Sequence, residues 1–292
     1  MTTPAVGGQN SHGHGPSAFG SDLRRFVELT LTIARTDFKL RYFGSALGYL
    51  WQLMRPLLFF GVIYVFFTQI LNIDKGVPHY GVYLLTGIVL WTFFGEATGN
   101  AVSSLVAREP LLRKVRFPRL AIPLAITMTS VFNLAMNSIA VIVFALANGV
   151  TPTLGWLWMI PIALGFITIA LGVGMLLSAL YVRFRDMQPI WEVVLQMLFY
   201  ASPIMYPAFK YAQFEHLAML NPFAMMLTQM GHSFVHPHSY YLNGVLQVPM
   251  RSAYASAGGL RNTLISLAFI PFVFVLGLWF FSREAPYFAE NL

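Results

Sequence analysis

A small set of polar side chains lies inside otherwise apolar segments, at spacings that place them on common helix faces. Phe93, Glu96 and Asn100 follow one another at steps of three and four residues, which is the spacing along one face of a helix. Polar groups inside a bilayer are costly unless they face protein or water. The stripe indicates either the lining of a polar conduit or hydrogen bonds between neighbouring helices, for which Ser, Thr and Asn are common. Both interpretations stay open at this point.

Other apolar segments carry similar stripes. The polar ones are Thr127, Ser130, Asn133 and Asn137 in one segment, and Glu192, Gln196, Phe199 and Pro203 in another. A third segment has an aromatic row, and aromatic faces can stack on sugar rings, although aromatic belts facing lipid use the same residue types. If these stripes line a conduit, the lining candidates are Phe60, Tyr64, Phe67, Phe93, Glu96, Asn100, Gln196 and Phe199.

Signatures of enzyme chemistry are absent from the sequence. It contains no GxxxxGK[ST] phosphate loop, no HExxH or clustered metal ligands, no GxSxG elbow and no cysteine. A membrane glycosyltransferase acting on a polyprenyl phosphate is the main alternative from another class. It would need acidic residues grouped on a cytoplasmic loop, and Asp186 stands alone in its loop. We therefore expect a protein that is not itself an enzyme and holds neither cofactor nor metal.

The composition requires a bilayer as solvent. Of the 292 residues, 57% are hydrophobic and 10% are charged, against roughly 25% charged residues in an ordinary soluble domain. The apolar residues form long blocks, and about 20 such residues in a helix span the hydrocarbon layer. The formal charge of +7 comes from residues beside these blocks, so it indicates membrane topology and not nucleic-acid binding.

Six apolar blocks qualify as membrane spans: 56–71, 81–105, 120–146, 154–180, 189–205 and 264–281. Lys and Arg favour the cytoplasmic side. With the N-terminus inside, 14 of the 18 Lys and Arg residues are cytoplasmic, and four are outside. We therefore predict a multi-pass protein of the cytoplasmic membrane with both termini in the cytoplasm.

The segments outside the spans complete the predicted organisation. Residues 1–21 are expected to be a disordered cytoplasmic tail, 22–47 an amphipathic helix in the membrane interface, 48–282 the transmembrane domain and 283–292 a cytoplasmic tail. The interfacial helix carries basic residues suited to an anionic headgroup or lipid diphosphate, namely Arg24, Arg25, Arg35, Lys39 and Arg41. An ordinary basic juxtamembrane segment is the alternative. Between the last two spans, an interrupted apolar patch allows short re-entrant helices or a surface loop.

Several short motifs flank the spans and occur in a familiar order. They are KLRYFGSALGYLW at 39–51 followed by RP at 55–56, LLRKVRFPR at 111–119, FRDM at 184–187, SPIMYP at 202–207 and NP at 221–222. Together they resemble the permease subunits of ABC-2 type polysaccharide and polyol-phosphate exporters, which include O-antigen, teichoic acid and mycobacterial galactan exporters. The resemblance extends from about residue 22 to 281, with 236–259 unmatched.

The resemblance implies an all-α integral membrane fold of six transmembrane helices, with an N-terminal interfacial helix and short re-entrant helices between helices five and six. It also implies a homodimer docked on two copies of a separate ATPase subunit, which would bind ATP and Mg²⁺. A cytoplasmic coupling helix is implied near 108–119, where a compact basic loop has one apolar side. The coupling residues are Arg108, Leu111, Leu112, Arg113, Lys114, Arg116, Phe117 and Pro118.

The expected function is export of a polyprenyl-diphosphate-linked polysaccharide, of galactan or O-antigen type, across the cytoplasmic membrane. The expected partners are a second copy of the chain, the ATPase, the lipid-linked glycan and membrane lipids, without nucleic acid. An ABC-2 exporter of a drug or smaller lipid is the alternative. That class shares the coupling logic but usually lacks the RYxxSxLGxLW pattern.

Overall fold

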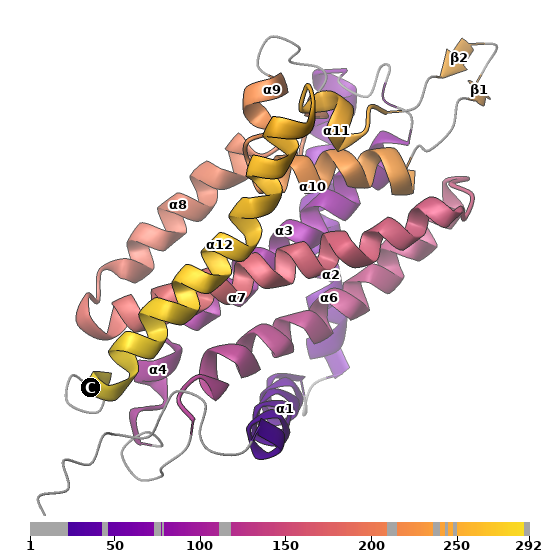
Figure 1. Ribbon diagram of the computed structural model, residues 1–292. Helices are drawn as coiled ribbons and strands as arrows, with labels where there is room; N and C mark the ends of the chain where they lie inside the picture. The colour runs from indigo at the N-terminus through magenta and orange to yellow at the C-terminus, as the bar shows by residue number, and fades with distance from the viewer. Residues whose placement is uncertain are drawn as a thin grey trace, which may run out of the picture.

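Helix α3 (Tyr80–Val102) is the centre of the fold. The computed structural model describes residues 23–42, 46–72, 77, 79–110, 118–208, 215–235, 240–242, 245–247 and 250–288. Residues 82–90 of α3 are all buried, as expected for a helix that is apolar around its whole circumference. Around α3 pack α2 (Ala46–Val65), α6 (Ala121–Ala147) and α7 (Met159–Arg183), all roughly along one axis (Figure 1).

Five helical stretches in the described part of the chain are long and apolar enough to cross a membrane. They are Leu50–Ile70, Tyr80–Val102, Ala121–Ala147, Leu154–Arg183 and Leu260–Tyr287. The first combines α2 with the π-helical turn η1 (Phe66–Ile70), the fourth combines η2 (Leu154–Trp158) with α7, and the last combines α12 (Leu260–Glu284) with η5 (Ala285–Tyr287). Five of the six predicted spans are thus confirmed by length and composition.

The remaining predicted span, 189–205, is represented by the shorter helix α8 (Met187–Ala201). Its 15 residues extend about 22 Å at 1.5 Å per residue, less than the hydrocarbon thickness of about 30 Å. The helix ends before Ser202 and Pro203, since the residue preceding a proline is disfavoured in helical conformation. Figure 1 shows α8 running from the end where α7 finishes to the opposite end of the bundle.

Helices α7 and α12 meet backbone to backbone at two glycines. A Cβ atom on Gly172 would lie 2.6 Å from the carbonyl oxygen of Val273, and one on Gly277 would meet the carbonyl oxygen of Gly172. Small residues allow this close approach. The resulting van der Waals contact between the backbones holds the two helices together in lipid, where no hydrophobic driving force acts between helices.

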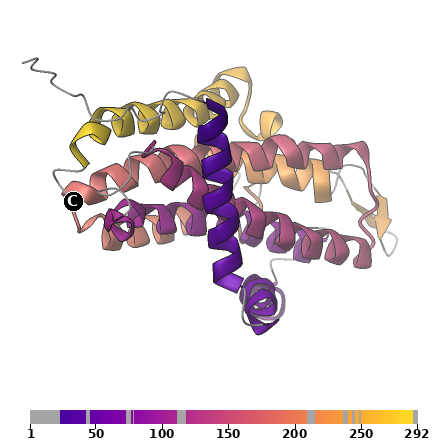
Figure 2. The same ribbon diagram turned by 90° about the horizontal axis from the view of Figure 1, so that it is seen from below.

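Helix α1 (Leu23–Tyr42) crosses the bundle at a steep angle (Figure 2). Phe26, Thr30 and Ala34 recur every four residues and are buried, and Thr129 Oγ1 of α6 donates a hydrogen bond to the Ala34 carbonyl at 3.3 Å. The five predicted headgroup residues Arg24, Arg25, Arg35, Lys39 and Arg41 are all exposed. Helix α1 thus has one face packed against the bundle and an exposed face that carries these basic residues. Its position in a membrane interface stays a prediction.

Short elements gather at the end of the bundle farthest from α1 (Figure 1). They are α9 (Glu215–Ala218), α10 (Pro222–Met230), the π-helical turn η4 (Gly231–Val235) and α11 (Ala253–Ser256). Asn221 caps α10 by accepting a hydrogen bond from the Phe223 amide at 3.0 Å, and Pro222 occupies the first helical turn, which is the usual place for proline.

A small hairpin departs from the all-helical prediction. Strand β1 (Tyr240–Leu242) pairs antiparallel with β2 (Val245–Gln247), with Tyr241 opposite Leu246. The two strands flank an Asn-Gly dipeptide in the sequence, which is a strong hairpin signal because both residues tolerate positive φ. Within the described residues, the long apolar stretches are helical, and a small β-hairpin lies between α10 and α12.

Candidate functional site

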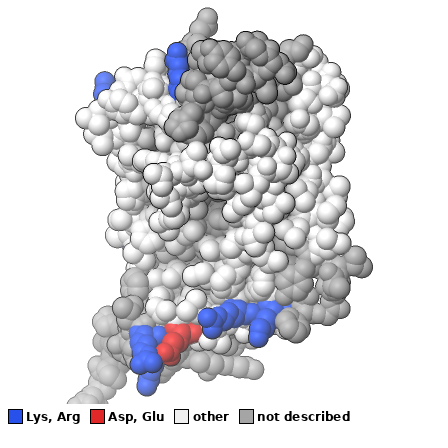
Figure 3. Space-filling view, turned by 90° about the vertical axis from the view of Figure 1, so that its right-hand side faces the viewer, with Lys and Arg blue, Asp and Glu red and all other residues white. Residues whose placement is uncertain are grey.

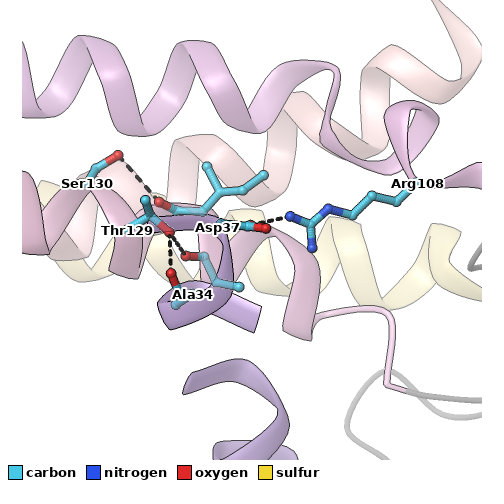
Figure 4. A network of polar contacts seen from close by, with 7 residues as sticks. Ala34, Asp37, Arg108, Thr129 and Ser130 are labelled. Atoms are coloured by element: carbon cyan, nitrogen blue, oxygen red, sulfur yellow. Dashed lines mark hydrogen bonds and ion pairs between the residues drawn. The ribbon is translucent and has the colours of Figure 1, made fainter. Parts of the chain in front are cut away.

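An ion pair joins α1 to the end of the α3 segment. The guanidinium of Arg108, just after α4 (Ser104–Ala107), contacts the carboxylate of Asp37 on α1. Both side chains are partly buried, with 22% and 30% of their surface exposed. Figure 4 shows Asp37 pointing toward Arg108 beside the Thr129 and Ala34 contact. Phe38 adds an edge-to-face contact with Phe132 of α6, with ring centroids 5.6 Å apart, so these three contacts hold α1 on α6 and on Arg108.

A cavity of about 330 Å³ with both polar and apolar lining lies at this junction. Its walls come from α1, the α3 to α4 segment and α6. Arg41 and Arg108 supply two cations, and Asp37 supplies the single carboxylate. The remaining lining residues combine polar side chains with an apolar wall: Leu40, Asn100, Ser103, Ser104, Ala107, Ile126 and Thr129. The cavity therefore carries a net positive charge.

Six of the eight predicted coupling residues fall within a gap in the described chain. Leu111, Leu112, Arg113, Lys114, Arg116 and Phe117 lie outside the described residues, and their coupling role stays a prediction. Arg108 and Pro118 border that segment. The next residue, Arg119, is buried, and loss of hydration lowers the pKa of its guanidinium.

Glu96 lies at the centre of a polar contact between three helices. One carboxylate oxygen accepts a hydrogen bond from Gln52 Nε2 of α2 at 2.9 Å, and the other accepts from Asn133 Nδ2 of α6 at 3.0 Å. The amide orientations follow from this network. Glu96 therefore joins α2 and α6 to the central helix, which is the interhelical interpretation of the stripe.

The other conduit candidates divide by exposure. Phe60, Phe93 and Phe199 are buried within the subunit, where Phe60 packs edge-to-face on Phe144 at 5.4 Å. Tyr64, Asn100 and Gln196 are exposed, while Phe67 and Glu96 are half-buried. Among the conduit candidates, only the exposed and half-buried side chains offer surface to a passing molecule in this conformation. Their role as a lining stays a prediction.

The SPIMYP and NP motifs meet at the end of the bundle opposite α1. The hydroxyl of Tyr80 donates to the Met205 carbonyl at 2.6 Å, and that of Tyr83 donates to the Pro203 carbonyl. Asn221 Nδ2 donates to Ser202 Oγ at 3.1 Å. Two separated motifs thus form one hydrogen-bonded junction that attaches the end of α8 to α3 and α10.

Sequence reasoning missed Asp37, Gln52 and the two tyrosines. Each acts through a partner at least 44 residues away, which no local spacing reveals. The available signal was Asp37 itself, an acidic residue on a helix otherwise rich in Arg and Lys.

Charge is segregated along the molecule. On the face seen in Figure 3, Lys and Arg form a band at one end with an acidic group among them, smaller Lys or Arg patches lie at the opposite end, and the middle of the face carries no charged groups. Within the described residues, no group of three or more His, Asp or Glu side chains could hold a metal ion.

Comparison with known proteins now identifies relatives. Residues 28–234 match the family model described as ABC-2 type transporter. The chain is 33% identical over 208 residues to the O-antigen export system permease protein RfbA of Klebsiella pneumoniae, covering 70% of this chain and 80% of that protein. It is also 30% identical over 186 residues to a protein of the same name from Myxococcus xanthus, covering 64% of this chain and 71% of the relative.

Proposed function

Because the chain belongs to the ABC-2 type transporter family and is a permease subunit homologous to O-antigen export permeases, we propose that it exports a polyprenyl-diphosphate-linked polysaccharide. The glycan enters from the cytoplasmic leaflet and leaves at the outer leaflet. The family lacks an ATPase domain, so a separate nucleotide-binding subunit, carrying ATP and Mg²⁺, drives the cycle. The observation that carries this proposal is similarity to proteins named for O-antigen export over most of the chain.

The proposed topology has six passes with both termini in the cytoplasm. The five long helical stretches support it, together with α8, which carries the chain between opposite ends of the bundle (Figure 1). The basic band supports placing the α1 end at the cytoplasmic face (Figure 3). The short elements α9, α10 and α11 then lie near the outer face, where α10 is buried in protein as a re-entrant segment must be.

The proposed assembly is a homodimer with two ATPase subunits. The apolar stretches that contain α2 and α12 are only 22% and 17% buried within the subunit, which leaves apolar surface for lipid and for the second copy of the proposed homodimer. Helices α2 and α8 adjoin each other through Phe59 and Phe199, whose ring centroids are 6.0 Å apart. We place the conduit beside the candidates of these two helices that keep exposed side-chain surface, Tyr64 of α2 and Gln196 of α8.

Removing this chain from its host tests the function. We expect polyprenyl-diphosphate-linked glycan to accumulate in the cytoplasmic membrane while surface glycan falls to background, because synthesis continues without exit. Radiolabelled membrane extracts and lectin binding to intact cells measure the two pools, and re-expression of the chain should restore both. Undiminished surface glycan without the chain would contradict the proposal. Composition analysis of the retained glycan decides between galactan and O-antigen types, which stays a prediction here.

The exposed conduit candidates give a second test. Replacing Tyr64 and Gln196 together by Ala should slow export about three- to tenfold, because a stacking surface and a hydrogen-bonding group are lost from the track. Initial rates of glycan appearance at the cell surface measure the effect. Phe272 on α12, 59% exposed, is the control: Phe272→Ala removes an exposed ring from another helix and should export normally. Equal rates for all three proteins would place the track elsewhere.

A further inference from the structure

The cavity between α1, α4 and α6 has side chains that could bind a phosphate group, but its principal donor, Arg108, is already paired with a carboxylate. Arg108 directs its guanidinium at the Asp37 carboxylate. Carboxylate and phosphate oxygens suit the same planar fork of N–H donors. Asp37 therefore occupies the position on Arg108 that a phosphate oxygen would take.

The other residues that line the cavity could bind a phosphate group as well. Arg41 contributes a second cation and forms no ion pair with any residue that the structure describes. Asn100 and Ser103 place an amide and a hydroxyl in the same wall. The volume of about 330 Å³ lies in the range of about 300–1,000 Å³ typical of small-molecule sites. Two cations with one carboxylate leave a positive charge for an anion to neutralise.

We infer that Arg108 exchanges partners, releasing Asp37 and binding the phosphate group of a lipid headgroup that enters this cavity. The inference rests on the proposed function and concerns how the substrate is sensed. This exchange would release α1 from Arg108, which lies directly before the predicted coupling segment 111–117. A ligand shifts such an equilibrium only through its preference for one state, and here that preference is competition for one guanidinium.

Competition makes a prediction that a merely structural ion pair does not make. Asp37→Asn removes the competing charge, so it should tighten binding of a polyprenyl diphosphate about three- to tenfold. Arg108→Gln removes the donor and should weaken binding about tenfold or more. If the pair only held α1 in place, both variants would weaken binding in the same direction.

The measurement uses the permease and ATPase complex in nanodiscs of phosphatidylcholine, titrated with undecaprenyl diphosphate and followed by bound-ligand mass spectrometry. Arg283→Gln is the matched control, because Arg283 is an exposed arginine of α12 whose guanidinium lies over the Trp279 ring, 5.6 Å from its centroid, and the affinity of this variant should equal that of the wild type. Parallel titrations with phosphatidylglycerol and with inorganic pyrophosphate distinguish a lipid-linked diphosphate from a phospholipid headgroup or a free phosphate.

The outcomes separate the two proposals. Opposite shifts for Asp37→Asn and Arg108→Gln support partner exchange. If the wild type binds and Asp37→Asn binds equally or more weakly, exchange is wrong while the export function stands. If the wild type binds only phosphatidylglycerol, the cavity is a phospholipid site, and partner exchange is no longer part of substrate sensing. If the wild type binds no phosphate probe, partner exchange is overturned, and the glycan-accumulation experiment decides the export function separately.

Discussion

Replacing Gly277 by Leu is expected to prevent α12 from packing on α7 and to lower the thermal midpoint of the purified protein by about 10 °C or more. A side chain at this position would enter the space of the Gly172 carbonyl. Because that obstacle is backbone, no rotamer change can relieve it, and the helices must separate. Overpacking costs about 1–3 kcal/mol where side chains can adjust, so a larger loss is expected here. Size-exclusion profiles after heating in detergent measure the midpoint.

A second glycine supplies the control. A Cβ on Gly95 of α3 would have no atom within 4 Å, so Gly95→Ala should leave the midpoint nearly unchanged or raise it, since Ala favours a helix by about 1 kcal/mol. A Gly277→Leu protein with the same midpoint as the wild type would show that α7 and α12 are not in backbone contact. Gly277→Ala should fall between these results.

The spans were predictable because the bilayer imposes one requirement on each of them. A helix of about 20 apolar residues satisfies it locally, so composition within a window was sufficient for five stretches. For α8 the same reasoning predicted too long a helix. The apolar block continues through Ser202 and Pro203, where the backbone turns and the helix has already ended. Hydropathy records the apolar block and does not record the break.

The amphipathic character of α1 was also predictable, because its buried residues recur with the helical period. The ion pair that attaches α1 to Arg108 was not predictable. Asp37 and Arg108 are 71 residues apart, and many arginines in this sequence were equally suitable partners for an acidic residue. The conduit stripe shows the same limit: spacing placed Glu96 on a polar face, but only the fold reveals that Gln52 and Asn133 approach that face from two other helices.

Replacing Arg113, Lys114 and Arg116 together by Ala is expected to reduce glycan export about 10- to 100-fold while the partner ATPase continues to hydrolyse ATP. The reason is mechanical: in the proposed mechanism, a cytoplasmic segment next to Arg108 transmits closure of the ATPase dimer to the spans. A coupling free energy of about 1–3 kcal/mol corresponds to about 5- to 150-fold. Export in reconstituted vesicles and phosphate release, measured on the same preparation, give the ratio of glycan moved to ATP consumed.

The same three residues also contribute to the charge bias that orients the chain, so orientation must be measured independently. The chain has no cysteine, and Tyr287 is 54% exposed in η5, directly after α12. Tyr287→Cys, made with and without the triple substitution, therefore reports with a membrane-impermeant thiol reagent which side this end occupies. Unchanged labelling with lost export assigns the segment to coupling. Normal export by a correctly inserted triple variant would remove that role, because the charges would then act only as topology signals.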